Sequence, residues 1–194
     1  MDERTVRPRE IDGNFQGVQA VLKAAHFAAQ KHAGQRRKGT AAEPYINHLL
    51  EVAELVSSAL AEPDIDLVIA ALLHDTVEDT GVTKEVLVEA FGSDVADLVM
   101  EVTDEKSLPK AERKRLQIVQ ASQISVRAQA IKLADKISNL RGILASPPAD
   151  WSGERKREYF EWAKQVVDCL SAPNQMLKAE FERLYRQVES LSSS

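Results

Sequence analysis

Apolar residues recur every three to four positions in segment after segment of this chain. One such segment contains Val18, Val21, Leu22, Ala25 and Ala28. This spacing lines one face of an α-helix with apolar side chains, whereas a half-buried strand requires alternation at every second residue. No run shows convincing alternation, although residues 39–46 have room for one short β-hairpin. The sequence therefore predicts an all-α fold, a single helical bundle of about eight to ten helices.

Length and composition indicate one domain over residues 1–194. Hydrophobic residues make up 44% of the chain and charged residues 28%, which is an ordinary globular mixture. Disorder is expected only at the two tips, residues 1–12 and 192–194. The single cysteine, Cys169, excludes an internal disulfide framework and fits a reducing compartment. Because Cys169 lies in an apolar pattern, we expect it to be a small core residue.

Net charge argues against a nucleic-acid partner. The chain carries a formal charge of -5 at pH 7, so its overall field repels polyanions. An anionic substrate would have to be captured by a local basic cluster instead. No stretch approaches the ~20 apolar residues of a membrane span, and the charged N-terminus has no apolar signal core. We therefore expect a cytoplasmic protein with no membrane partner; its oligomeric state is left open.

The dipeptide His74-Asp75 follows an apolar run, residues 65–73, for which Asp64 is a plausible helix cap. Buried imidazole and carboxylate groups are costly unless something compensates them. His48 and Asp135 lie on two further amphipathic segments and complete a set of four nitrogen and oxygen ligands. A mixed set without thiolates suits Mn²⁺, Fe²⁺ or Zn²⁺ rather than a cysteine-rich structural zinc site. The alternative is that these are unrelated structural residues.

Two carboxylates, Glu78 and Asp79, follow at helical spacing. On a continuous helix, Glu78 lies one turn beyond His74 and Asp79 one turn beyond Asp75. A carboxylate near a metal centre can accept the proton of an attacking water. The hypothesis is therefore a metal-dependent hydrolase, and the alternative is a solvent-exposed acidic helix end.

Basic residues precede His48 and recur later in the chain. Three positive charges stand in the loop Gln35–Gly39, where an arginine can grip a phosphate with two hydrogen bonds. A solvated loop is the alternative. Weaker candidates for contacts with a nucleotide are Lys110, Asn139, Arg155 and Tyr159. Asn139 lies one turn after Asp135, and Arg155 and Tyr159 share one helical face. The charged stretch 112–115 is interpreted as the solvated face of a short helix.

The combined motifs resemble a known family. They are Tyr45-Ile46-Asn47-His48, the stretch from Ala70 to Thr80 that contains His74-Asp75-Thr76-Val77-Glu78-Asp79, and Lys132-Leu133-Ala134-Asp135-Lys136. They are similar to the HD-domain metal-dependent phosphohydrolases and, more narrowly, to the stand-alone small alarmone hydrolases of the metazoan SpoT homologue type. The similarity runs from about Ala24 to Trp162. One departure is Leu49, because the family usually has proline after the motif histidine.

The resemblance implies an enzyme that removes pyrophosphate from the 3′ position of guanosine tetraphosphate or pentaphosphate (ppGpp or pppGpp), typically with Mn²⁺ and without synthetase activity. It implies three groups of site residues. The metal ligands would be His48, His74, Asp75 and Asp135. The residues that handle the attacking water would be Glu78 and Asp79. The nucleotide contacts would be Arg37, Lys38, Lys110, Asn139, Arg155 and Tyr159. Alternatives are a phosphohydrolase for another nucleotide, such as a deoxynucleotide or NADPH, and a non-catalytic alarmone sensor.

Overall fold

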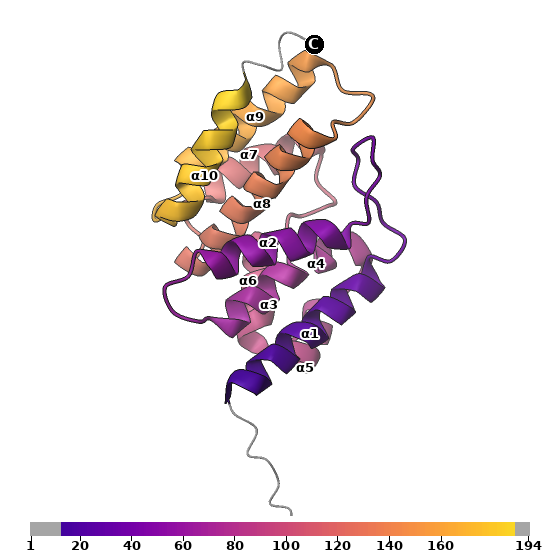
Figure 1. The fold of residues 1–194 in the computed structure, drawn as a ribbon, viewed down its shortest axis with the longest axis vertical. Helices are drawn as coiled ribbons and strands as arrows, with labels where there is room; N and C mark the ends of the chain where they lie inside the picture. The colour runs from indigo at the N-terminus through magenta and orange to yellow at the C-terminus, as the bar shows by residue number, and fades with distance from the viewer. Residues whose placement is uncertain (1–12, 189–194) are drawn as a thin grey trace, which may run out of the picture.

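The chain folds into α-helices joined by short loops, which confirms the predicted all-α class (Figure 1). The computed structural model describes residues 13–188. The helices in that range are α1 (Gly13–Lys31), α2 (Ile46–Ser58), α3 (Ile65–Leu73), α4 (Thr76–Thr80), α5 (Lys84–Phe91), α6 (Ser93–Val102), α7 (Lys110–Gln120), α8 (Val126–Ala145), α9 (Gly153–Asp168) and α10 (Gln175–Tyr185). The tips expected to be disordered, residues 1–12 and 192–194, lie outside the described residues.

The expected β-hairpin is reduced to a single contact. Arg36 and Pro44 form one isolated antiparallel bridge, and residues 13–188 contain no strand. The loop that carries the basic residues therefore doubles back on itself between α1 and α2. Leu49, which replaces the usual proline, is completely buried in the core, so the substitution is absorbed by packing in the first turns of α2.

Helix α3 begins where the sequence predicts and ends earlier. The Asp64 side chain accepts a hydrogen bond from the Leu67 backbone N–H at 3.0 Å, which caps the helix. The helix ends at Leu73, and α4 begins only at Thr76, so the continuous helix expected through His74 and Asp75 is interrupted. The chain still makes one helical turn there, because the Asp79 N–H donates to the Asp75 carbonyl oxygen at 2.9 Å.

Helix α8 is the central element of the bundle. It packs against α2, α3 and α6 on one side and against α9 and α10 on the other, so it joins the two groups of helices seen in Figure 1. More than half of its residues are buried, among them Ile131, Leu133 and Ile137. A helix buried on several sides has little freedom to rotate or shift, so side chains on α8 are held in fixed positions.

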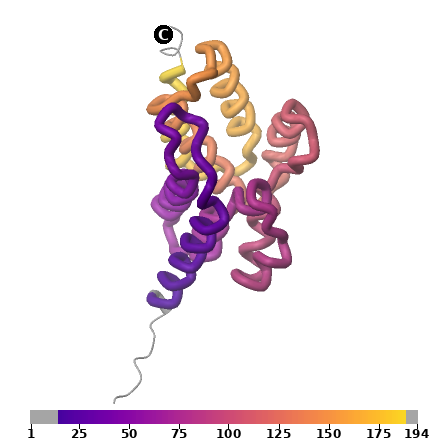
Figure 2. Tube along the Cα trace, turned by 90° about the vertical axis from the view of Figure 1, so that its right-hand side faces the viewer, coloured from indigo at the N-terminus to yellow at the C-terminus, as the bar shows by residue number. Residues whose placement is uncertain are grey.

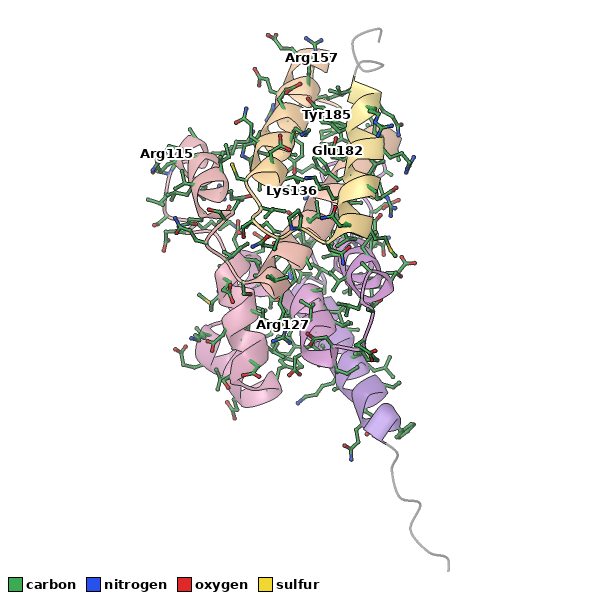
Figure 3. All side chains as sticks on the ribbon, turned by 90° about the vertical axis from the view of Figure 1, so that its left-hand side faces the viewer. Arg115, Arg127, Lys136, Arg157, Glu182 and Tyr185 are labelled. Atoms are coloured by element: carbon green, nitrogen blue, oxygen red, sulfur yellow. The ribbon has the colours of Figure 1, made fainter. Side chains whose placement is uncertain are left out.

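Helix α7 is the least buried helix and stands at the edge of the molecule (Figure 2). Its contacts are mainly with α9, where the Trp162 indole N–H donates to the Lys114 carbonyl oxygen at 3.1 Å. Arg115 projects outward from α7, while Lys136 lies inside the bundle (Figure 3).

Cys169 is exposed, so its expected place in the core is wrong. It follows the last residue of α9, where the neighbouring Val167 and Leu170 are buried and Cys169 falls on the outward side. No helix within residues 13–188 has both the length and the apolar character that crossing a lipid bilayer demands.

Candidate metal centre and phosphate pocket

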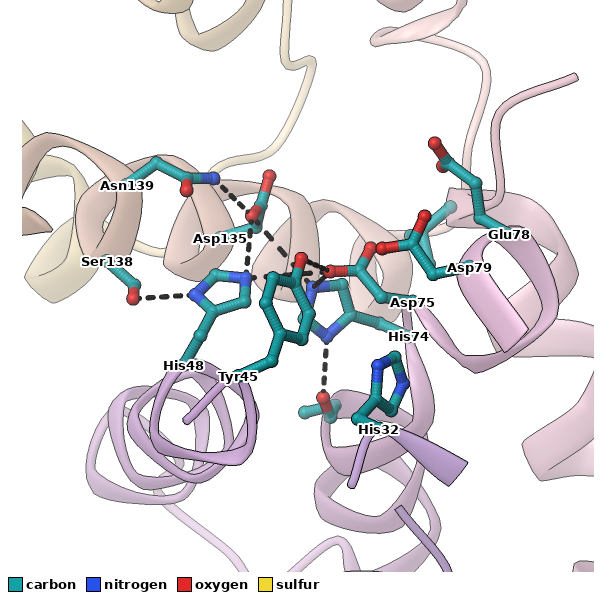
Figure 4. A network of polar contacts seen from close by, with 12 residues as sticks. His32, Tyr45, His48, His74, Asp75, Glu78, Asp79, Asp135, Ser138 and Asn139 are labelled. Carbon is teal, nitrogen blue, oxygen red and sulfur yellow. Dashed lines mark hydrogen bonds and ion pairs between the residues drawn. The ribbon is translucent and has the colours of Figure 1, made fainter. Parts of the chain in front are cut away.

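The four predicted metal ligands converge from two helices and one break between helices (Figure 4). His48 comes from α2, His74 and Asp75 from the break between α3 and α4, and Asp135 from α8. The Nε2 atom of His48 lies 3.7 Å from Asp75 Oδ2 and 3.3 Å from Asp135 Oδ1. The Nε2 atom of His74 lies 3.2 Å and 3.9 Å from the same two oxygens. Residues separated by up to 87 positions thus face one point.

These distances fit a divalent cation. Donor atoms about 2.1 Å from one metal ion lie roughly 3.0 to 3.4 Å apart, depending on whether the geometry is octahedral or tetrahedral. The observed separations of 3.2 to 3.9 Å are equal to or slightly wider than these values. His48, His74 and Asp135 each place one ligand atom within 4.8 Å of the others, and Asp75 is close to both imidazoles.

The tautomer of His74 supports the same interpretation. Its Nδ1 atom lies 2.8 Å from the Ala71 carbonyl oxygen, which can only accept a hydrogen bond, so Nδ1 carries the proton. In the neutral imidazole, Nε2 then carries the lone pair and faces Asp75 and Asp135. This buried atom has no hydrogen-bond partner in the described part of the chain. Because an unpaired buried polar atom is costly, the Nε2 atom of His74 is the strongest local indication that this position binds a cation.

The electrostatic field at this point favours positive charge. Burial alone would raise the pKa of the Asp75 carboxyl, but the neighbouring His74 holds it well below its usual range. Burial would likewise raise the pKa of Asp135, but Lys136 and His48 hold it well below its usual range. Burial opposes a charge on His74, yet the attraction of Asp75 raises the His74 pKa to about 9. Two ionised carboxylates in a buried site are what a divalent cation would compensate.

Glu78 and Asp79 lie beyond Asp75, on the side of the cluster away from His48 (Figure 4). Burial and the nearby charge of Asp104 raise the pKa of Glu78, which makes its carboxylate a stronger base. Asp79 pairs with Lys106 and accepts a hydrogen bond from Gln35 Nε2 at 2.7 Å. Both carboxylates line the larger cavity described below. Glu78 also lines a small cavity of about 40 Å³ together with His74, Asp75 and Asp135.

Sequence reasoning missed two residues that support this centre. The Tyr45 hydroxyl donates to Asp75 Oδ2 at 2.5 Å, and its ring stacks on that of His32 with the centroids 5.2 Å apart. Gln35 bridges His32 to Asp79, since its Oε1 atom lies 2.6 Å from His32 Nδ1. Tyr45 stands three residues before His48, and that helical spacing was an available indication. His32, which directly follows the last residue of α1, is buried.

A cavity of about 610 Å³ opens next to the cluster. Tyr45, Asn139, Glu78 and Asp79 line it on the side of the metal ligands. Eight cationic side chains also line it: Arg36, Arg37, Lys38, Lys106, Lys110, Arg113, Lys114 and Arg155. Only four carboxylates do so, including the two of α4, so the cavity concentrates positive charge in a chain whose net charge is -5.

All six predicted nucleotide contacts line this cavity. Asn139 also donates to Asp135 Oδ1 at 2.6 Å, as its position one turn later predicts. The Arg155 guanidinium lies 4.9 Å from the centre of the Trp151 ring, and burial raises the pKa of the Tyr159 hydroxyl to about 12. Trp151, which the sequence did not indicate, thus lines the cavity as a third planar group, beside the Arg155 guanidinium and the Tyr159 ring.

The interpretation of residues 112–115 as a solvated face is only half right. Arg115 is exposed, but Arg113 and Lys114 line the cavity. Burial and repulsion from Lys110 lower the pKa of Lys114, while burial and repulsion from Arg155 lower that of Lys110. Crowded ammonium groups of this kind are stabilised when an anion lies between them.

The basic loop is attached to the end of α8. The Thr40 N–H donates to the Pro147 carbonyl oxygen at 3.2 Å, and the Ala41 N–H donates to Ser146 Oγ at 2.8 Å. Gly39 is required at this contact, because a Cβ atom there would lie 2.1 Å from the Ser146 carbonyl oxygen. The loop therefore holds Arg37 and Lys38 over the cavity.

Comparisons with known proteins agree with this geometry. Residues 24–161 match the HD domain family. The chain is 49% identical over 167 residues to the Homo sapiens guanosine-3′,5′-bis(diphosphate) 3′-pyrophosphohydrolase MESH1, covering 86% of this chain and 93% of that protein. It is 48% identical to the Xenopus tropicalis protein of the same name, covering 85% and 92%. A solved structure of a metazoan orthologue of SpoT that hydrolyses ppGpp superposes with a TM-score of 0.83 at 46% identity, covering 87% of this chain and 94% of that one.

Proposed function

This chain belongs to the HD domain family, and we propose that it removes pyrophosphate from the ribose 3′ position of guanosine tetraphosphate or pentaphosphate. The observation that carries the proposal is the convergence of two imidazoles and two carboxylates around the unpartnered Nε2 atom of His74, beside a cavity lined by cations. The substrate is named from the relatives, which cover most of the chain and carry that activity in their names.

We propose that His48, His74, Asp75 and Asp135 hold a divalent cation, with Mn²⁺ the expected ion and Fe²⁺ or Zn²⁺ able to use the same donors. The site has nitrogen and carboxylate oxygen donors and no thiolate, which matches the preferences of these ions. A cation held there would supply Lewis acidity, which polarises a phosphate oxygen and makes water a stronger acid.

The cationic side chains that line the cavity bind the phosphates in this proposal. Arg37 and Lys38 are held by the anchored loop on one side of the cavity, and Lys110 lies across from it, within range of the repulsion exerted by Lys38. Arg155 and Tyr159 stand one helical turn apart on α9, so a flat base can lie against the ring while the guanidinium meets a phosphate. Asn139 contributes an amide beside Asp135.

The chemical step is the hydrolysis of one phosphoester bond. The oxygen of water bonds to the phosphorus atom attached to ribose O3′, and the bond between that phosphorus and O3′ breaks. Glu78 or Asp79 accepts the proton of the water, and O3′ takes a proton from solvent, so that guanosine diphosphate or triphosphate and pyrophosphate leave. The raised pKa of Glu78 suits it as the base, while Lys106 and Gln35 orient Asp79.

The remaining proposals concern organisation and place. We propose that the chain is one HD-type domain, because α8 packs against both groups of helices. We also propose a cytoplasmic location, for which a chain with one cysteine, and that one exposed and unpaired, is suited.

The test is turnover of purified protein, reconstituted with Mn²⁺ in the absence of oxygen, with the products identified. We expect wild-type protein to yield equimolar pyrophosphate and guanosine diphosphate from guanosine tetraphosphate. Asp135→Ala should lose the metal and nearly all turnover, whereas Asp97→Ala, which removes an exposed carboxylate, should change neither. Orthophosphate as the product, or full activity in metal-free protein, would refute the proposal. A deoxynucleotide and NADPH in the same panel test the other nucleotide substrates.

A further inference from the structure

The hydroxyl of Ser138 contacts three polar side chains, one of which is the ring of the proposed metal ligand His48 (Figure 4). Its Oγ atom is 2.8 Å from His48 Nδ1, 2.5 Å from Glu51 Oε2 and 3.1 Å from Arg37 Nη1. Ser138 is completely buried, so each of these contacts replaces a hydrogen bond to water. A serine in the middle of α8 thus joins a proposed metal ligand, a carboxylate on α2 and the phosphate-binding loop.

The hydrogen-bonding capacity of a hydroxyl determines the direction of these contacts. A serine hydroxyl has one proton to donate and two lone pairs that accept. The Glu51 carboxylate only accepts, so it receives the Ser138 proton, and Arg37 only donates, so it occupies one lone pair. The remaining lone pair faces His48 Nδ1, which must therefore carry a proton. The Nε2 lone pair of His48 is then free to face Asp75 and Asp135.

Glu51 is held in place from the far side by Arg141. The Arg141 guanidinium donates from Nη1 to Glu51 Oε1 at 2.9 Å and from Nη2 to Glu180 Oε1 at 2.7 Å. Both of these arginine contacts are short and charge-assisted, and one of them ties α8 to α10. The carboxylate that accepts from Ser138 is thus held in place by a second hydrogen bond, from Arg141.

We propose that Ser138 and Glu51 are positioning residues that fix the tautomer and ring orientation of His48 for metal binding. The proposal rests on the function proposed above, since it assumes that His48 is a metal ligand. A hydrogen bond from the second ring nitrogen to an oxygen orients a ligating histidine, and a carboxylate behind that oxygen makes the imidazole a stronger donor. Here the oxygen that accepts from His48 is the Ser138 hydroxyl, and the carboxylate is Glu51, which accepts in turn from that hydroxyl.

Arg37 gives this arrangement a second consequence. Its guanidinium donates to both the hydroxyl and the backbone carbonyl oxygen of Ser138 and to Asn139 Oδ1. A Cβ atom at Gly142 would lie 2.7 Å from Arg37 Nη2, so a glycine one turn along α8 leaves room for the guanidinium. The same hydroxyl therefore aligns a proposed metal ligand and a proposed phosphate ligand.

The experiment measures the Mn²⁺ dissociation constant by electron paramagnetic resonance of the free ion, together with the visible spectrum of the Co²⁺ form. Ser138→Ala and Glu51→Ala should each weaken Mn²⁺ binding by about 10- to 100-fold and shift the Co²⁺ bands. The double variant should lose little more than Ser138→Ala alone, because both substitutions interrupt one relay. Glu51→Gln, which keeps the shape of the side chain, should show a smaller loss in the same direction. Glu54→Ala, on the exposed face of α2, is the control and should bind as wild type does.

The outcomes separate this inference from the proposed function. Folded Ser138→Ala and Glu51→Gln proteins that both bind Mn²⁺ within about twofold of wild type would overturn the relay while leaving the metal centre intact. Fully additive losses in the double variant would overturn it as well, because they indicate independent effects. A wild-type protein that binds no Mn²⁺ would overturn the metal centre and with it the relay.

Discussion

Lys136 provides a quantitative test of the charge balance behind the metal centre. Its ammonium group lies 2.9 Å from Asp135 Oδ2 and 4.5 Å from the centre of the Trp162 ring, and the side chain is only 3% exposed. Burial opposes the charge of Lys136, but the attraction of Asp135 raises its pKa above the usual range. Replacing it in Lys136→Met keeps an unbranched apolar stem on Trp162 and removes only the cation.

The expected cost follows from the separation and the burial. At an effective dielectric constant of about 20, unit charges 2.9 Å apart attract by about 6 kcal/mol, and this attraction is partly offset by desolvation. Removing one partner of a buried pair typically costs 3–5 kcal/mol, and we expect about 3 kcal/mol because Asp135 keeps His48 and Asn139 as neighbours. For a chain of this size that is a fall of about 6–12 °C in the melting temperature of metal-free protein.

The assay is thermal unfolding of metal-free and Mn²⁺-loaded protein by differential scanning calorimetry. Because the cation also compensates Asp135, Mn²⁺ should raise the melting temperature of Lys136→Met more than that of wild type. Lys84→Met is the matched control: its partner Asp97 is 2.6 Å away, but the two side chains are 46% and 58% exposed, so about 1 kcal/mol or less is expected. Equal shifts for the two variants, or no extra gain from Mn²⁺, would refute the reasoning.

Three further substitutions test other parts of the site. Glu78→Gln should lower kcat by about 10²- to 10⁴-fold with KM and Mn²⁺ affinity nearly unchanged, as steady-state kinetics and metal titration will show. Arg37→Lys keeps the charge but cannot form a bidentate pair of hydrogen bonds with a phosphate, so KM for guanosine tetraphosphate should rise by about tenfold or more. Hydrogen bonds from Arg183, which outweigh burial, lower the pKa of Glu180 to about 2. The stabilisation that the Glu180 carboxylate contributes is therefore complete above its unfolded pKa of about 4.3 and is lost as pH falls toward 2. The free energies of unfolding of wild type and Glu180→Gln, measured with denaturant, should differ by about 1 kcal/mol at pH 7 and converge near pH 2.

The helices were predictable because each depends on local spacing. Asp64 and Ser152 each accept a hydrogen bond from a backbone N–H three residues later, and this capping needs no information from the rest of the fold. The break between Leu73 and Thr76 was not predictable, because no glycine or proline marks it. The break places His74 and Asp75 at the same point. Their positions there are set by long-range contacts with Tyr45 and Asp135 and not by helix periodicity.

The convergence of His48, His74, Asp75 and Asp135 was predictable because buried charge is costly wherever it occurs in a sequence. The cavity wall from α7 was not, since charged residues at positions 110 and 112–115 surround the first turns of that helix and none of its residues is buried. The sequence of these turns therefore does not indicate which face turns inward. Contacts with α9 decide that Arg113 and Lys114 face the cavity. Ser138 gave no indication either, because a small residue on an apolar helix face is usually only a packing element.

The two sides of the site differ in how firmly the fold holds them. The proposed metal ligands come from α2, the end of α3 and α8, which are packed together in the core, so their geometry is largely preorganised. The proposed phosphate-binding cations come mainly from the loop before α2 and from α7, which have few buried groups. We therefore expect a highly charged substrate to shift the cationic side chains that line the cavity, while the four proposed metal ligands stay in place. Ser138 joins the two sides, because Arg37 and His48 both bond its buried hydroxyl.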